Sequence, residues 1–277
     1  MHIPDGYLGP STYGSLWAAM IGIWSYVSRK VKRELKTSQV PFLAMASAFS
    51  FVAMIFTIPL PGGTTAHITG ATLVAILLGP WAAVIAVSVA LIIQALVFGD
   101  GGVTAIAANC FNIAFVGSLA GYGIYRLSEK AGERFNLEAT TPLRTSIRIA
   151  GTALGAYTGM NAAAFCTAVE LGIQPIIYRN NAGAGYFPYP LSVAFPAVML
   201  PHLSLVGLLE ATVAALVMSF LKKSSIRVNS RVCMMFVSLM VIGLAQAPSA
   251  LAHDYMIEQK GQDILLVYGH GKQAMEF

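Results

Sequence analysis

Apolar residues dominate this chain in runs long enough to cross a lipid bilayer, and short polar or basic segments separate the runs. At a rise of about 1.5 Å per residue, a membrane-spanning helix needs about 20 mostly apolar residues. The pattern therefore predicts one helix over each of these stretches: 11–28, 40–59, 103–125, 147–171 and 192–221.

A longer apolar run, 68–98, contains Gly79 and Pro80 near its middle. Proline is tolerated at the start of a helix but breaks a helix interior. The run therefore predicts a short helix over 68–78 that dips into the membrane and a second helix over 81–98 that returns. Together with the five single helices, this predicts a seven-helix bundle.

Basic residues gather in three clusters near the ends of predicted helices. Short loops rich in Lys and Arg stay on the cytoplasmic side of a membrane. All three clusters fall on that side when the chain crosses seven times, so we expect the N-terminus to lie outside the cell membrane. The clusters are Arg29, Lys30, Lys32, Arg33 and Lys36; Arg126, Lys130, Arg134, Arg144 and Arg148; and Lys222, Lys223, Arg227 and Arg231.

The composition agrees with this topology. Of 277 residues, 56% are hydrophobic and 10% are charged, against about 25% charged in an average soluble domain. We therefore expect an all-α polytopic protein of the inner (plasma) membrane. The net charge of +5 is explained by the loop clusters, so no nucleic-acid partner is expected. Cys110, Cys166 and Cys233 lack CxxC spacing and are interpreted as small core residues.

The C-terminal part of the chain has a different pattern from residues 1–222, which form the predicted membrane domain. Residues 223–252 run from basic through apolar to small residues at "ALA", which is typical of a secretory signal placed internally. We expect an eighth helix or a cleavable leader there. In 253–277, "DILLVYG" predicts a strand at the start of a truncated, β-rich domain outside the membrane.

The opening "MHIPDGYLGP" places a histidine beside the terminal amine. It lacks the positive region of a signal peptide, and the bulky His2 disfavours removal of Met1, so we expect a free mature amine there. That amine has an ordinary pKa near 7.7–8.0 and is partly deprotonated at neutral pH. The amine and the His2 backbone nitrogen close a five-membered chelate ring, and the same backbone nitrogen and His2 Nδ1 close a six-membered ring. Nickel(II) and copper(II) favour such planar nitrogen sites.

His67, in "PGGTTAHITG", is the best candidate for the fourth position of the square. The predicted topology places His67 on the same outer face as Met1, and glycines before it permit close backbone approach. One neutral imidazole nitrogen would bind the ion, and a second group would hold the other nitrogen. Met1, His2 and His67 are thus the predicted metal ligands.

Other polar residues carry less specific signals. Polar groups inside a membrane are costly and often functional, but for His202 and Glu210 we favour packing or a subunit contact over metal binding. Asp100 and Glu170 fall near outer helix ends and are expected to be solvated. Asp5 fits either a turn cap or a hydrogen bond to a ligand, and both alternatives stay open.

Four segments together resemble the CbiM/NikM family, the substrate-binding membrane subunits of energy-coupling-factor transporters for nickel and cobalt. The resemblance covers about 1–222 and implies a seven-helix bundle whose N-terminal tail inserts and binds the ion through Met1, His2 and His67. The "GTTAHITG" form resembles the nickel branch, and Co²⁺ is the alternative cargo. The segments are "MHIPDGYLGP", "PGGTTAHITGATLVAILLGPWAA", "ALVFGDGGVTAIAANCFNIAFVG" and "PHLSLVGLLEA".

The resemblance also implies partners: a transmembrane coupling subunit, cytoplasmic ABC-type ATPases and, for the C-terminal segment, a fused or separate small accessory membrane subunit. Small residues at Ala44 and Ala48 resemble the helix face that meets the coupling subunit. The other pairs with this spacing, which let helices approach closely, are Gly117 with Gly121 and Gly155 with Gly159. Internal packing is the alternative role for all three pairs.

The sequence does not contain the motifs that other candidate functions require. The chain has no GxxxxGK[ST] phosphate loop, so ATP hydrolysis would come from a partner. An intramembrane metalloprotease needs a motif such as HExxH, which is absent, and we expect no enzymatic activity. A channel needs polar residues along several helices, and a metal sensor is the remaining alternative. A closed metal site at the N-terminus fits the capture and release of an ion better than conduction through a channel.

Overall fold

The computed structural model describes residues 2–60, 64–135, 141–178, 186–223, 254–260 and 263–269. The chain divides into two compact units, Met1–Val237 and Ser238–Phe277. The eighth helix or leader was predicted within 223–252, and of that range the structure describes Lys223 alone. Cys233 therefore also lies outside the described residues.

All seven predicted helices form in the first unit. The helices α1 (Pro10–Glu34) and α2 (Val40–Ile55) are joined through the 3₁₀ turn η1 (Thr37–Gln39). The short α3 (Ala71–Leu78) is followed by α4 (Pro80–Ile93), which continues into the π-helical segment η2 (Gln94–Phe98). The break falls at Gly79, whose φ of 92° favours glycine, and at Pro80, which begins the next helix.

The second half of the bundle consists of longer helices with π-helical turns inside them. One continuous helix comprises α5 (Ile106–Asn109), η3 (Cys110–Gly117) and α6 (Ser118–Arg134). It is followed by α7 (Pro142–Gly172) and the short α8 (Gln174–Ile177). The last helix comprises α9 (Leu191–Pro201), η4 (His202–Val206) and α10 (Gly207–Lys223). Among the described residues, five helices are long and apolar enough to cross a membrane.

One predicted helix ends earlier than expected. The stretch 40–59 was expected to be helical throughout, but α2 stops at Ile55 and the chain turns into β1 (Thr57–Leu60). Pro59 explains the stop, because proline has no N–H for a helix and disfavours a helical residue before it. β1 pairs antiparallel with β2 (Thr64–His67), so that Thr57 lies opposite His67. The expected outer loop is therefore a hairpin that ends at His67.

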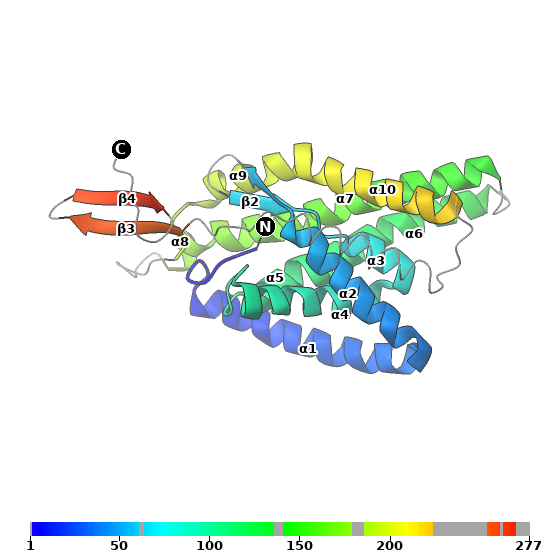
Figure 1. The fold of residues 1–277 in the computed structure, drawn as a ribbon, viewed down its shortest axis with the longest axis horizontal. Helices are drawn as coiled ribbons and strands as arrows, with labels where there is room; N and C mark the ends of the chain where they lie inside the picture. The colour runs from blue at the N-terminus through cyan, green and yellow to red at the C-terminus, as the bar shows by residue number, and fades with distance from the viewer. Residues whose placement is uncertain are drawn as a thin grey trace. The chain divides into compact units, whose positions relative to one another are not determined.

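The helix α7 packs against both α6 and α10 and runs alongside them (Figure 1). Its glycines meet those of the preceding helix: a Cβ on Gly155 would lie 2.6 Å from the carbonyl oxygen of Gly121, and one on Gly159 would lie 2.5 Å from that of Gly117. Both predicted glycine pairs thus serve internal packing. At one end of the same interface, Glu129 of α6 pairs with Arg144 and Arg148 of α7, each at 3.2 Å.

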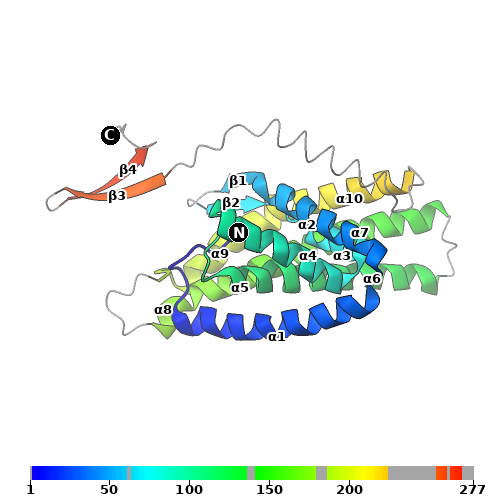
Figure 2. The same ribbon diagram turned by 60° about the horizontal axis from the view of Figure 1, so that its bottom comes forward.

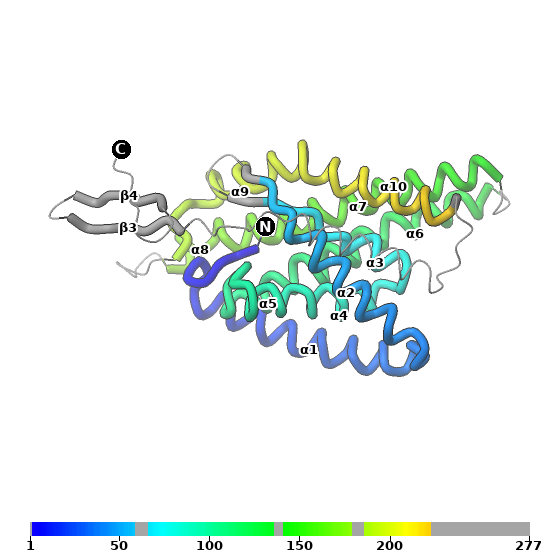
Figure 3. The backbone as a smooth tube through the Cα atoms, in the orientation of Figure 1, coloured from blue at the N-terminus to red at the C-terminus, as the bar shows by residue number. Residues whose placement is uncertain are grey.

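The N-terminal tail, residues 2–9, folds back onto the bundle beside α5 and the start of α1, as the tube in Figure 3 shows. Figure 2 places α1 along one side of the bundle, with the tail leading inward from its start. Ile3 and Leu8 are buried in one apolar cluster with Ala105 and Leu171. The tail is therefore part of the core of this unit.

The second unit contains a hairpin of β3 (Asp254–Lys260) and β4 (Asp263–Gly269). The strands pair antiparallel, with Asp254 opposite Gly269. The predicted strand "DILLVYG" is thus confirmed as β4.

Candidate metal centre

The tail is held next to His2 by Asn109 of α5. The side-chain oxygen of Asn109 accepts the N–H of Ile3 at 2.8 Å, and its amide nitrogen donates to the Ile3 carbonyl at 3.2 Å. Gly102 also donates its N–H to that carbonyl at 2.9 Å. Both backbone groups of a fully buried residue are therefore paired, which fixes the path of the chain immediately after His2.

Asp5 caps the loop that follows η2. Its carboxylate accepts the N–H groups of Val103 and Thr104 at 2.9 and 2.8 Å, and the Thr104 hydroxyl at 2.5 Å. The bond from the Thr104 hydroxyl and those from the two N–H groups hold the pKa of Asp5 below its usual value. A Cβ on Gly102 would overlap the backbone of Asp5, so glycine is required there. Of the two roles left open for Asp5, the structure shows the turn cap.

The far end of the tail is fixed by Gln174, which is 1% exposed. Its side-chain oxygen accepts the N–H of Gly9 at 3.0 Å, and its amide donates to the Glu170 carbonyl oxygen at 2.6 Å and to the Thr12 hydroxyl at 3.2 Å. The sequence reasoning missed both Asn109 and Gln174. Their only signal is an amide side chain inside or beside an apolar run, which is costly unless it is hydrogen-bonded.

His2 and His67 come together in the structure. Their ring centroids lie 4.4 Å apart with an angle of 33° between the planes. The His2 side chain is 5% exposed and His67 is 1% exposed. His67 ends β2, so the hairpin delivers it to the point that the tail reaches.

Both imidazoles are electrically suited to bind a metal. Burial lowers the pKa of His67 well below its usual value, and the neighbouring His2 and His202 lower it further. Burial also lowers the pKa of His2, although its contact with Asp100 opposes the shift. Both rings are therefore neutral near pH 7. Within the described residues, Nε2 of His2 has no hydrogen-bond partner. Neither nitrogen of His67 makes a hydrogen bond of full geometry, although the nearby Ile68 backbone partly opposes the fall in the pKa of His67.

Asp100 contacts the ring of His2. Its Oδ1 lies 3.0 Å from His2 Nδ1, the nitrogen that the predicted chelate uses. Binding through Nδ1 therefore requires this ring to turn away from Asp100. Asp100 was expected to be solvated, and its side chain is 40% exposed. Burial of the rest of the side chain raises its pKa, but the hydrogen bond and charge of His2 outweigh this effect, so the pKa of Asp100 lies below its usual value.

The complete set of metal ligands stays a prediction. Met1 lies outside the described residues. Among the residues that the structure describes, no three His, Cys, Asp or Glu side chains converge on a point where a metal ion could bind. The predicted set places just two side chains on the ion, because its other two nitrogens belong to the backbone and the terminal amine.

Glu210 and His202 flank the His67 segment. The buried Glu210 accepts the N–H of Thr69 at 2.8 Å, the hydroxyl of Thr69 at 3.0 Å and the N–H of Gly70 at 2.9 Å. It thereby attaches the start of α3 to α10. His202 is 3% exposed, and its Nδ1 lies 2.7 Å from the Val198 carbonyl oxygen.

The prediction for Glu170 was wrong. We expected a solvated carboxylate, but Glu170 is 8% exposed and accepts a hydrogen bond from Asn112 at 2.7 Å. The helix α7 continues past it to Gly172, so Glu170 faces η3 rather than water. Of the cysteines, Cys110 is buried as predicted and Cys166 is half-buried.

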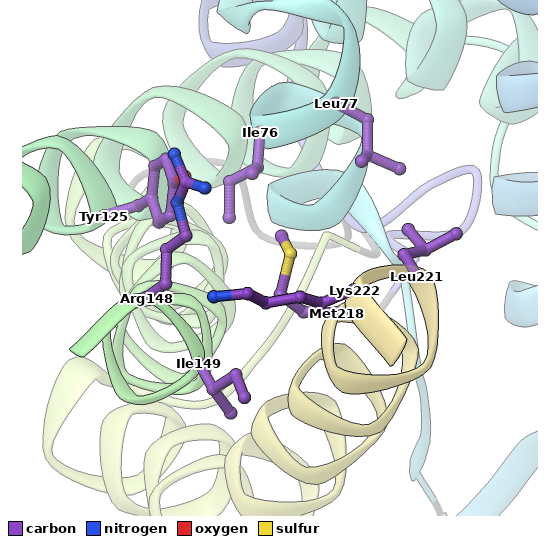
Figure 4. Close-up of a pocket in the computed structure, with 8 residues that line it drawn as sticks. All are labelled: Ile76, Leu77, Tyr125, Arg148, Ile149, Met218, Leu221 and Lys222. Carbon is purple, nitrogen blue, oxygen red and sulfur yellow. The ribbon is translucent and has the colours of Figure 1, made fainter. Parts of the chain in front are cut away.

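A cavity of about 290 Å³ opens between α3, α6, α7 and α10, away from His2 and His67. Figure 4 shows Lys222 extending across it towards the side that carries Arg148. Two cationic side chains and no carboxylate or imidazole line this cavity, so it repels a metal cation. Its other lining residues are Ile76, Leu77, Tyr125, Ile149, Met218 and Leu221.

Comparison with known proteins points to metal transport. The chain is 47% identical over 226 residues to a fused nickel transport protein, NikMN, of Rhodobacter capsulatus, covering 81% of this chain and 62% of that protein. It is 42% identical to a probable fused nickel transport protein, LarMN, of Lactiplantibacillus plantarum, covering 80% and 65%. The chain thus spans less than two thirds of these fused relatives.

A solved structure shares the fold. A truncated transition metal transporter superposes with a TM-score of 0.72 at 46% identity, covering 81% of this chain and 99% of that one. Residues 2–228 match the CbiM family, described as the cobalt uptake substrate-specific transmembrane region. This match covers the whole bundle and the tail from His2 onward. The chain belongs to the CbiM family of metal-transport membrane proteins.

Proposed function

We propose that this chain is the substrate-specific membrane component of an energy-coupling-factor transporter that captures Ni²⁺ from outside the cell membrane. The observation that carries the proposal is the pair of buried, neutral imidazoles of His2 and His67, whose ring centroids lie 4.4 Å apart at the end of an anchored tail. The Met1 amine and the His2 backbone nitrogen complete a square of four nitrogens. Such a planar set favours nickel, and Co²⁺ is the alternative cargo.

The energy for release comes from partners in this proposal. The sequence has no phosphate-binding loop, so cytoplasmic ABC-type ATPases and a transmembrane coupling subunit would drive opening of the site to the inside, for example by tilting the bundle. Ala44 is exposed and Ala48 is half-buried on α2, which leaves this small-residue face available for the coupling subunit. A small accessory membrane subunit, fused or separate, completes the assembly.

The chain itself would bind and hand over the ion without chemistry. The runner-up, an intramembrane metalloenzyme, needs a third side-chain ligand and a catalytic base beside the metal. Among the described residues no such group of His, Cys, Asp or Glu is found.

The test is nickel binding to the purified chain with an unmodified N-terminus, compared with His2→Ala and His67→Ala. We expect roughly one nickel per chain, lost in both variants, and weaker or no retention of cobalt. A second arm adds residues before Met1, which moves the amine and should also abolish binding. Metal retained in both alanine variants, or in the extended chain, would contradict this ligand set.

A further inference from the structure

His202 lies where the last membrane helix changes from α-helical to π-helical winding. It is the first residue of the π-helical segment η4, directly after Pro201. The strand β2, which ends at His67, packs against η4.

The hydrogen bond of His202 fixes its tautomer. Its Nδ1 lies 2.7 Å from the carbonyl oxygen of Val198, and a carbonyl oxygen can only accept. Nδ1 therefore carries the proton, and in the neutral ring Nε2 has a free lone pair. Among the described residues this Nε2 is buried and has no hydrogen-bond partner. A buried acceptor without a donor is costly, which suggests that a donor reaches it in another state of the protein.

His67 supplies the matching donor when it binds metal. Its two ring nitrogens are buried and make no hydrogen bond of full geometry in the described part of the chain, although the Ile68 backbone lies near the ring. If one nitrogen binds the ion, the other must carry the proton, and metal-binding histidines almost always donate that N–H to an acceptor. Glu210, the nearby carboxylate, already uses both of its oxygens to accept from Thr69 and Gly70.

His202 could instead be a direct ligand, but the geometry disfavours this role. Among the described residues no three metal-binding side chains converge on one point, so His2, His67 and His202 do not form a common site. We propose that His202 is a positioning residue: its Nε2 accepts the N–H of metal-bound His67 and holds that ring in its ligating orientation. This inference rests on the proposed function.

The experiment measures nickel affinity by titration calorimetry for a set of variants with unmodified N-termini. His202→Gln places an amide oxygen near the position of Nε2, whereas the shorter His202→Asn cannot reach it, and His202→Leu removes the acceptor. We expect His202→Gln to bind close to the wild type, and His202→Leu and His202→Asn to bind about 10- to 100-fold more weakly. The visible absorption band of bound nickel should shift in His202→Leu and His202→Asn, and its position in His202→Gln should match that of the wild type.

Two controls keep the outcomes separate. His67→Ala tests the metal site itself, and its failure to lower affinity would overturn the proposed function rather than this inference alone. Gln94→Leu tests the rival acceptor, because the buried amide of Gln94 also lacks a partner among the described residues. We expect Gln94→Leu to bind nickel like the wild type.

The inference is overturned if His202→Leu binds as tightly as the wild type while His67→Ala does not bind. It is also overturned if His202→Gln and His202→Asn weaken nickel binding equally, because the imidazole would then act through its shape. It is likewise overturned if nickel affinity falls in Gln94→Leu and in none of the variants at 202. Should His202→Leu fail to fold, the Gln and Asn pair decides the question without it.

Discussion

The side chain of Asn109 hydrogen-bonds both the N–H and the carbonyl of Ile3, at 2.8 and 3.2 Å, one residue after His2. This two-point contact sets the position of the tail relative to α5 before any metal binds. Because a pre-ordered ligand set avoids the entropy cost of ordering the chain on binding, such anchoring raises affinity without touching the ion.

Replacing Asn109 should therefore weaken nickel binding. Two neutral hydrogen bonds contribute about 0.5–1.5 kcal/mol each, so Asn109→Leu should lower affinity about 5- to 100-fold. Asn109→Asp should behave similarly, since a carboxylate can accept from the Ile3 N–H but repels its carbonyl. Titration calorimetry gives the comparison, with Ser128→Ala as a control because Ser128 bonds within its own helix. Unchanged affinity in Asn109→Leu would show that the tail orders independently of this contact.

The helical bundle could be predicted from the sequence because each helix corresponds to a continuous apolar run of residues. Gly79 and Pro80 placed the break between α3 and α4 correctly, since both the left-handed φ and the proline act locally. The hairpin after Ile55 was missed because the residues of its first strand continue the apolar run. Pro59 was the one residue in that strand that argued against a helix.

The pairing of polar side chains could not be predicted in the same way. Glu170 meets Asn112, and Asn109 meets Ile3, across separations of more than 50 residues. The packing of the helices determines these partners, and a local sequence pattern does not show how helices pack. His2 and His67 were predicted to meet because of their residue type and their expected place on the same face of the membrane, and the structure brings their rings together, while their role as ligands stays a prediction.

Nickel binding should weaken as the pH falls from 8 to 6, and the imidazoles should not be the cause. Burial lowers the folded pKa of both His2 and His67, so each ring is already neutral at pH 7 and releases almost no proton to the metal. The amine, with an ordinary pKa near 7.7–8.0, and the ionised backbone nitrogen should together release about two protons at pH 7. Calorimetry in buffers of different ionisation enthalpy counts these protons. A count near three or four would mean that the imidazoles are protonated before binding.

The glycine contact between α6 and α7 should be sensitive to any added side chain. A Cβ on Gly121 would overlap the Thr72 hydroxyl and lie 2.9 Å from the Gly155 carbonyl oxygen, whereas one on Gly123 would meet nothing within 4 Å. Overpacking of this kind costs about 1–3 kcal/mol, so Gly121→Leu should lower the melting temperature in detergent by about 3–10 °C. Gly123→Ala on the same helix should be neutral or slightly stabilising. Equal melting temperatures for the two variants would show that the helices can separate without loss.

Glu210 should couple the stability of α10 to the position of His67. Its two oxygens accept three hydrogen bonds from Thr69 and Gly70, which lie two and three residues after His67. In Glu210→Gln one oxygen becomes an NH₂ group that faces N–H donors, and each buried donor left without an acceptor costs about 1–3 kcal/mol. We expect a lower melting temperature without nickel and weaker nickel binding, both measured on the same preparation. The control is Thr212→Ala, because Thr212 is exposed on the same helix and bonds within it. If Glu210→Gln matches this control in both measurements, the carboxylate does not hold the His67 segment in place.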